Sequence, residues 1–313
     1  MKRQQSNDNI TSLYQQFQTH NKVKNLSEKT IDYYYWNLKP FINYLSSKHI
    51  ISISKVNSSI VDNYVLFQKE KYSNTTSINT RLRAVRVFLY WCMNSRYLKP
   101  FKIHLLKQKE EPLKLYSDDD IQKLIAKPNL KECSFVEYRD WALVNYFIET
   151  GNRLRSVINI KVSDVDFSGY KVIIRETKNK EILITPLTKI LLNILPPYIR
   201  TWGLKAEQYL FPDVKGNQLT ENAAKHTISV YNRKHGVSIT SIHAFRHTFA
   251  RNYIVTGGNA FKLQSLLGHK DLTMTRHYVH LFGEDLASDI DKHSIVERIK
   301  PTSNRLTKSK RRI

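Results

Sequence analysis

The last third of the sequence concentrates side chains that suit phosphodiester chemistry. The segment His243-Ala-Phe-Arg246-His247 is followed by Leu-Leu-Gly-His269 and then by Tyr278. A guanidinium group is planar, bidentate and permanently charged, which suits the anionic oxygens of a phosphate. A phenol, with its ordinary pKa of ~10, attacks phosphorus only when a base or a positive field helps it. These residue types predict an enzyme that acts on DNA.

Their spacing is that of one helical face. His243 lies three positions before Arg246 and four before His247, so a helix can turn all three toward one side. Two histidines four apart also occur in zinc sites. Here position 244 is Ala, so the general base of a His-Glu-x-x-His zinc site is missing, and we expect no metal and no other cofactor.

The charge of the chain indicates a polyanionic partner. The 313 residues are enough for two domains, and the formal net charge is +23 with a pI near 9.8. Residues 1–115 carry 19 basic and 7 acidic side chains, and the remainder carries 31 and 20. Because both parts are basic, both domains are expected to contact DNA as a clamp would. The alternative is an ordinary solvated surface in a lysine-rich composition.

Cysteine usage and hydropathy point to the cytoplasm. Cys92 and Cys133 are too few for a disulfide framework, so a reducing compartment is expected, with both packing as small apolar side chains. No apolar run is long enough to span a membrane, and the first residues lack the apolar core of a signal peptide.

Helical periodicity dominates residues 1–105. Apolar side chains recur at helical spacing in residues 10–17, 31–45, 59–71 and 78–92, and Ser27 is placed to cap the second of these segments. Arg81, Arg83 and Arg86 lie on the last segment, away from its apolar stripe, and are candidates for phosphate contacts or for a plain solvated face. Residues 106–116, with several lysines and a proline, are interpreted as an interdomain linker.

A second domain is expected over residues 117–300. Ser117 precedes three aspartates that suit the start of a helix, and a later helix ends at Thr150-Gly151. Segments 165–167, 171–175 and 181–187 read as short strands, and most of the rest is helical. Residues 301–313 hold five basic and no acidic side chains and read as a tail. The predicted fold is mainly α with a small β-sheet, divided into a helical domain and a mixed α+β domain.

These residues resemble the tyrosine recombinases, the family of phage-type integrases and two-domain Xer-like resolvases. Thr150-Gly-Asn-Arg153 is similar to the family's Thr-Gly-x-Arg, the histidine and arginine boxes described above match in order, and Tyr278 stands at the nucleophile's place. Lys178 stands where the family commonly has a catalytic lysine, and Lys180 competes for that role. The first domain is similar to the family's helical, SAM-like core-binding domain.

The resemblance implies a role for each matched residue. Tyr278 would attack a DNA phosphate to give a 3′-phosphotyrosyl link and a free 5′-hydroxyl, with Arg153 and Arg246 on the nonbridging oxygens. Lys178 would protonate the leaving oxygen, and the three histidines have separate roles. His243 would take the phenolic proton, His269 would hydrogen-bond a nonbridging oxygen, and His247 would support these groups.

Partners and biological role follow less directly. The resemblance implies a homotetramer on two double-stranded sites, and a helix over residues 281–299 would pack on a neighbouring protomer or on its own domain. One position departs from the family: Ser156 stands where an acid is usual. A type IB topoisomerase-like relaxing enzyme and a non-catalytic DNA-binding protein remain alternatives. Target sequence, accessory proteins and the choice between mobile-element integrase and dimer resolvase stay open.

Overall fold

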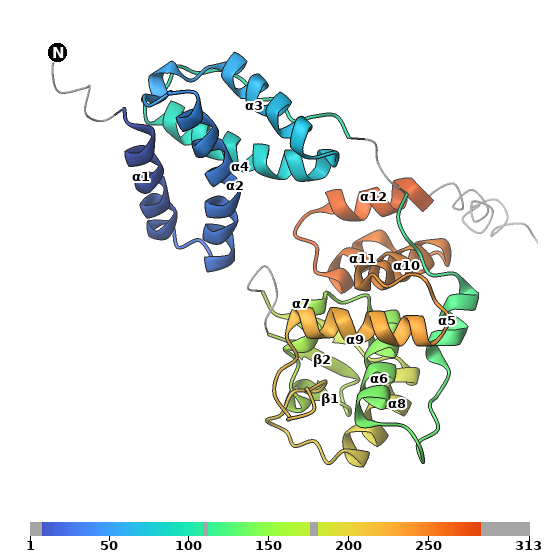
Figure 1. The fold of residues 1–313 in the computed structure, drawn as a ribbon. Helices are drawn as coiled ribbons and strands as arrows, with labels where there is room; N and C mark the ends of the chain where they lie inside the picture. Colours follow the sequence, from blue (N-terminus) through green and yellow to red (C-terminus); the bar gives the residue numbers. More distant parts are fainter. Residues whose placement is uncertain (1–7, 109–111, 176–180, 283–313) are drawn as a thin grey trace, which may run out of the picture. The chain divides into compact units, whose positions relative to one another are not determined.

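The computed structural model describes residues 8–108, 112–175 and 181–282. The chain divides into two compact units, residues 1–111 and 112–313, called unit 1 and unit 2 below (Figure 1). Each unit has its own hydrophobic core. In the described residues helices predominate and are accompanied by one small sheet, so the predicted fold class is confirmed.

Unit 1 is built from helices that enclose an apolar core. Its described helices are α1 (Ile10–Val23), α2 (Glu28–Ser47), α3 (Ser58–Lys71) and α4 (Thr75–Asn94). Each of these begins after a Ser or Asn whose side chain accepts a hydrogen bond from the first turn, as Ser27 does for α2. Such caps satisfy amide groups that have no partner within the helix. Phe41 and Phe88 are fully buried, so the apolar stripes of α2 and α4 face one core.

The three arginines of α4 have different surroundings. The guanidinium of Arg81 lies 3.9 Å from the ring centre of Tyr72 and donates a hydrogen bond of 2.9 Å to Gln68. Arg83 is exposed, and Arg86 is partly buried. Internal contacts therefore hold Arg81, whereas the side chain of Arg83 faces solvent.

Unit 2 is organised around α6 (Phe135–Thr150), which is buried along most of its length. Against α6 pack four other helices: α5 (Asp118–Ile125), α8 (Lys189–Thr201), α9 (Glu221–Lys234) and α10 (Ile242–Val255). Three further helices complete the described part: α7 (Leu154–Ile158), α11 (Ala260–Leu267) and α12 (Leu272–Phe282). Helices α10, α11 and α12 contact one another and lie together in Figure 1.

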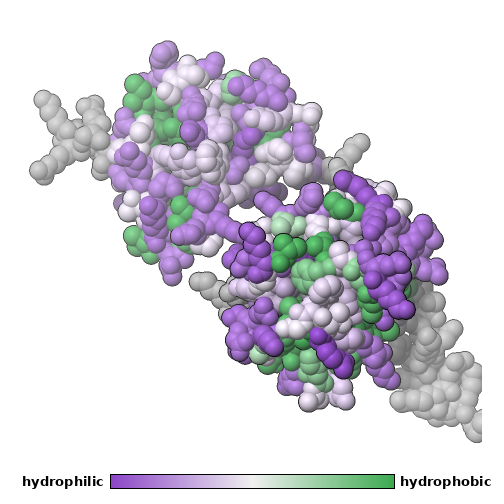
Figure 2. All heavy atoms as spheres, turned by 60° about the horizontal axis from the view of Figure 1, so that its bottom comes forward, coloured by the Kyte–Doolittle hydropathy of each residue, from purple (hydrophilic) through white to green (hydrophobic). Residues whose placement is uncertain are grey.

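The sheet of unit 2 is antiparallel, with strand order β1 (Val165–Asp166), β2 (Lys171–Ile174) and β3 (Leu183–Pro186). Val172 pairs with Thr185, and both are buried, so alternate residues of β2 and β3 face the core. On the face drawn in Figure 2, hydrophilic side chains cover most of both units and apolar ones form small groups.

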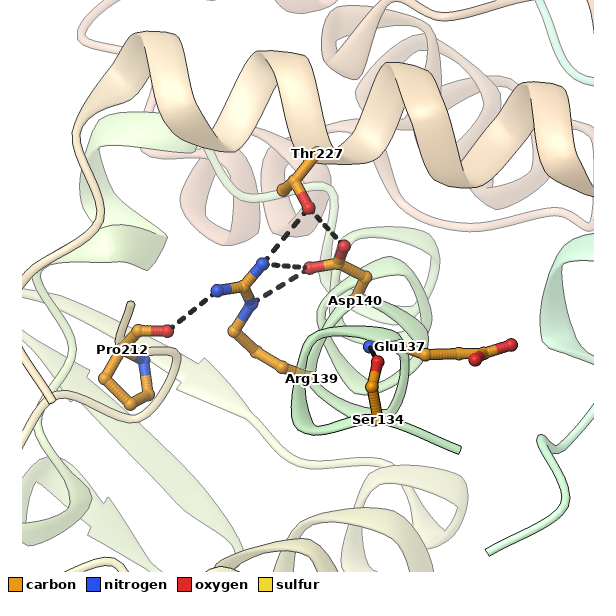
Figure 3. Close-up of polar contacts among 6 residues, drawn as sticks. All are labelled: Ser134, Glu137, Arg139, Asp140, Pro212 and Thr227. Carbon is orange, nitrogen blue, oxygen red and sulfur yellow. Dashed lines mark hydrogen bonds and ion pairs between the residues drawn. The ribbon is translucent and has the colours of Figure 1, made fainter. Parts of the chain in front are cut away.

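A buried ion pair ties α6 to α9 and to the segment between α8 and α9. Arg139 donates two hydrogen bonds to Asp140, of 2.7 and 2.9 Å, and one of 3.0 Å to the carbonyl of Pro212 (Figure 3). Thr227 of α9 contacts both charged groups. The side chains of both ions are only 4% exposed, so the charges are satisfied by each other and by these neighbours.

Both ends of the predicted linker contact folded structure. Asn79 exchanges two hydrogen bonds of 2.9 Å with the backbone of Leu106 in unit 1. In unit 2 the buried Tyr116 stacks on Phe245, and its amide donates to Thr248. Leu106 and Tyr116 are therefore fixed to unit 1 and unit 2, respectively.

Candidate active site

The turn after α6 places the first arginine of the site. Gly151 ends the helix with φ of +60°, and a Cβ there would lie 2.6 Å from the ring of Phe249, so both the conformation and the space require glycine. Asn152 follows, and its buried amide exchanges hydrogen bonds with the buried Thr185 of β3. Arg153, at the start of α7, is therefore held between α6 and the sheet.

Carbonyl groups at the carboxyl end of α11 accept hydrogen bonds from both arginines. Gly268 ends that helix with φ of +60° and leaves the last carbonyls free. Arg153 Nη1 donates to the carbonyls of Leu267 and Gly268, at 3.2 and 3.1 Å, and Arg246 Nη2 donates to the same Leu267 carbonyl at 2.9 Å. These carbonyls form the negative end of the helix dipole, which favours the approach of cations.

Arg246, the second arginine, is almost enclosed. It is 6% exposed, and its Nη1 donates a hydrogen bond of 2.9 Å to the carbonyl of Gly151. Burial, and next the positive charge of Arg153, lower the pKa of Arg246 to about 10. The group still carries its charge at neutral pH, so two cations lie at one end of α11.

His269 is neutral in this arrangement and its tautomer follows from its partners. Arg246 Nη2 lies 2.7 Å from His269 Nε2, and a guanidinium can only donate, so Nε2 accepts. The ring hydrogen is then on Nδ1, which donates to the buried Thr275 hydroxyl at 2.8 Å. Burial, and next the charges of Arg246 and Arg153, lower the pKa of His269 to about 4.

The phenol of Tyr278 lies among these groups. Tyr278 belongs to α12 and is 2% exposed, its ring stacks on that of His269 at 6.3 Å between centroids, and its hydroxyl lies 2.8 Å from His247 Nδ1. Burial raises the pKa of the phenol, and Arg246 and Arg153 act against that rise. The nucleophile candidate is thus surrounded by positive charge within its own chain.

His243 of α10 lies at the surface. It is exposed, and it lines a groove of about 460 Å³ together with Lys225 and Arg233 of α9. Among the described residues, no hydrogen bond joins His243 to Tyr278. The two histidines of the His243-Ala-Phe-Arg246-His247 segment therefore have different neighbours, although both lie on α10.

A cavity of about 300 Å³ opens beside Arg153. Arg153 and His269 line it, together with the buried Ser156 and with Glu181. Ser156 stands three residues beyond Arg153 and brings no charge. Of the described residues that line the cavity, Glu181 is the acidic one.

Of the residues predicted for the site, the structure brings together Arg153, Arg246, His247, His269 and Tyr278. Lys178 and Lys180 lie outside the described residues, as does most of the segment 281–299. Arg81, Arg83 and Arg86 belong to unit 1.

Sequence reasoning missed several supporting groups. These are Asn152, Thr185, Thr275 and the carbonyls of residues 151, 267 and 268. Their partners are distant in sequence or belong to the main chain, which leaves no local pattern to read. Within the described residues, no cluster of three His, Cys, Asp or Glu side chains is arranged to hold a metal ion.

Most of the sequence matches the models of a known family. The model of the phage integrase family matches residues 115–284, and that of the N-terminal SAM-like domain of phage integrases matches residues 15–95. The chain belongs to the phage integrase family. Its relatives include the tyrosine recombinase XerC of Staphylococcus epidermidis, 27% identical over 273 residues, which are 84% of this chain and 90% of that protein. XerC of Staphylococcus aureus is 25% identical over 270 residues, 84% and 89% of the two chains.

Solved structures share the fold. The Tn1549 transposon integrase in complex with a circular intermediate DNA has a TM-score of 0.71 at 18% identity, over 91% of this chain and 99% of that one. The lambda integrase dimer bound to a COC′ core site has a TM-score of 0.68 at 14% identity, over 86% and 77%. Family and relatives make this chain a tyrosine-type site-specific recombinase.

Proposed function

We propose that this recombinase cuts and rejoins double-stranded DNA through a 3′-phosphotyrosyl link to Tyr278. The observation that carries the proposal is the position of the phenol, which lies against His247 and His269 and in the field of Arg246 and Arg153. Attack forms the bond between phosphorus and the phenolic oxygen and breaks the bond to the 5′-oxygen. Because the phosphotyrosine keeps the bond energy, a 5′-hydroxyl can reverse the step without ATP.

The cavity beside Arg153 is our candidate site for the scissile phosphate. The bonds of Arg153 to the α11 carbonyls use Nη1. No other described residue accepts a hydrogen bond from its Nε or Nη2, so these groups can face nonbridging oxygens. Positive charge held at those oxygens stabilises the pentacoordinate transition state. A phosphate there would also raise the low pKa of His269, and its Nε2 could then carry a hydrogen and donate to the phosphate.

The deciding experiment is trapping of the covalent intermediate. Nicked suicide duplexes tiled across the DNA that flanks the gene are mixed with the protein, and adducts are resolved under denaturing conditions. The wild-type chain and Tyr253→Phe, a matched change on α10, should form the adduct, and Tyr278→Phe should form none. An adduct formed normally by Tyr278→Phe would remove the assignment.

The leaving oxygen needs a proton, and we assign its transfer to Lys178 with Lys180 as the competing residue. A 5′-phosphorothiolate substrate has a leaving group that departs without a proton. Such a substrate should restore cleavage in the alanine variant of the true acid, and only in that one. Equal behaviour of the two variants would contradict the assignment.

The finer features of the reaction are proposals of the same kind. In unit 1, Arg83 and Arg86 would contact DNA phosphates. Arg81 would do so through the guanidinium hydrogens that its internal contacts do not use. A homotetramer would bring two sites together, in the service of a mobile element or of the resolution of replicon dimers, and light scattering of the DNA complex measures that stoichiometry. Cys92 and Cys133 are both free thiols, which supports action in the reducing cytoplasm. Within the described residues, no helix combines the length and apolar character needed to cross a bilayer.

A further inference from the structure

We propose that His247 accepts the proton of Tyr278 when the phenol attacks phosphorus, and returns it when the strands are rejoined. The inference rests on the proposed function, because it assigns the proton transfer of that same reaction. The recombinase would thus use the second histidine of the His243-Ala-Phe-Arg246-His247 segment, not the first, as its general base.

The geometry around the phenolic oxygen carries the assignment. His247 Nδ1 lies 2.8 Å from the Tyr278 hydroxyl, which is the distance of an O–H···N hydrogen bond. With the ring hydrogen on Nε2, Nδ1 has a lone pair directed at the phenolic hydrogen. His247 is partly buried and Tyr278 almost fully buried, so water competes poorly for this contact.

Among the residues that the structure describes, the other basic groups near the phenol are occupied or make no hydrogen bond to it. A guanidinium has no lone pair to offer, which excludes Arg246 and Arg153. His269 accepts from Arg246 through Nε2 and donates to Thr275 through Nδ1, so neither ring nitrogen is free. His243 and His277 make no hydrogen bond to the phenol among the described residues, and the ring centre of His277 lies 6.4 Å from that of Tyr278.

The electrostatic surroundings keep His247 ready to accept. Burial, and next the groups His243, Arg246 and His277, lower its pKa below the usual value. The first two lie on its own helix α10 and the third on α12. Its ring is therefore neutral at neutral pH, as an acceptor must be. Once the proton has moved, the imidazolium and the attacking phenolate oxygen are adjacent, and the charge on the oxygen passes to phosphorus as the new bond forms.

The protons balance over the whole cycle. On cleavage, His247 Nδ1 takes the phenolic hydrogen and the 5′-oxygen receives a separate proton from the general acid. On rejoining, the 5′-hydroxyl gives its proton back to that acid and attacks phosphorus. The departing phenolate then takes its hydrogen from His247. By this symmetry, loss of His247 should slow cleavage and rejoining alike.

The test compares His247→Gln, His243→Gln and the control His280→Gln, an exposed histidine on α12, in single-turnover adduct formation on the suicide duplex that traps the wild-type chain. We expect His247→Gln to be slower by about 100- to 10,000-fold at neutral pH, the range of a general base. His280→Gln should keep the wild-type rate. Melting temperature and noncovalent DNA binding report whether each variant folds.

Fluorination of the nucleophile separates a base from a merely structural residue. Ring-fluorinated tyrosine, whose phenol ionises near neutral pH, is placed at position 278 by codon suppression. The defect of His247→Gln should then shrink to less than about tenfold, since an ionised phenol gains little from a base. Should His247→Gln fail to fold, His247→Ala with added imidazole replaces it, and imidazole should restore the rate.

Each other result overturns the assignment. The assignment is wrong if His247→Gln reacts at the wild-type rate. It is also wrong if fluorination of Tyr278 does not reduce the defect of His247→Gln, or if fluorination restores His243→Gln instead. If the wild-type chain forms no adduct at all, the proposed function fails and the role of His247 fails with it. If the wild-type adduct forms and only the His247 results disagree, the proposed function stands.

Discussion

Replacing Gly151 by alanine should disturb both the stability of unit 2 and the placement of Arg246. The left-handed backbone, with φ of +60°, costs a side chain about 1–2 kcal/mol. The new Cβ would also lie 2.6 Å from the ring of Phe249 and 3.1 Å from Leu267, which adds about 1–3 kcal/mol of overpacking. Gly151→Ala should therefore lower the free energy of unfolding by about 2–5 kcal/mol.

Gly203 supplies the matched control. It has φ of +59°, and a Cβ there meets no atom within 4 Å, so Gly203→Ala should lose only the backbone cost of about 1–2 kcal/mol. Urea unfolding of the full chain measures both variants. Adduct formation is measured in parallel, and Gly151→Ala alone should be slowed, by about 100-fold for a displacement near 1 Å of the groups around Arg246. Equal losses of stability in the two variants would refute the reasoning.

Three further results are expected. Asp140→Leu should lower the free energy of unfolding by about 3–5 kcal/mol because Arg139 is left buried without its counter-charge, and the double change Arg139→Met with Asp140→Leu should recover most of it in a double-mutant cycle. Thr275→Val should slow adduct formation about 10- to 100-fold because it removes the hydrogen-bond partner of His269 Nδ1, and leaving that buried group unpaired costs about 1–3 kcal/mol. Thr275→Ser keeps the hydroxyl and should keep the rate. Between pH 4 and 6.5 the unfolded chain protonates His269 while the folded chain keeps it neutral, so stability should rise with pH by up to about 3 kcal/mol, and His269→Gln should flatten that rise in urea titrations.

Local sequence signals predicted the elements of this fold well. Ser27 caps α2 as expected, Gly151 ends α6, and the strand segments near residues 171 and 183 pair as β2 and β3. Each of these features is determined by residues within a few positions of one another: a cap, a glycine at positive φ, a short run of apolar side chains. Such patterns are visible in the sequence because the interactions behind them are local.

The sequence allowed only part of the candidate site to be predicted. The types and spacing of Arg246, His247, His269 and Tyr278 indicated phosphodiester chemistry, but which histidine meets the phenol depends on how α12 packs on α10. The contact of Thr275 with His269 and that of Asn152 with Thr185 likewise depend on tertiary packing. The groups that hold the arginines are carbonyls, which every residue possesses, so no choice of side chain marks them.

The main-chain acceptors at the end of α11 have a consequence for how this recombinase tolerates change. Substitution at position 267 alters a side chain but leaves the oxygen that both guanidinium groups share. Only a change in the path of the backbone would move this oxygen. A residue at position 268 that cannot adopt the left-handed conformation would cause such a change, and both arginines would then lose the acceptor that they share. The losses of activity caused by a substitution at Gly268 and by one at either arginine should therefore be less than additive when combined, because they disrupt the same set of hydrogen bonds.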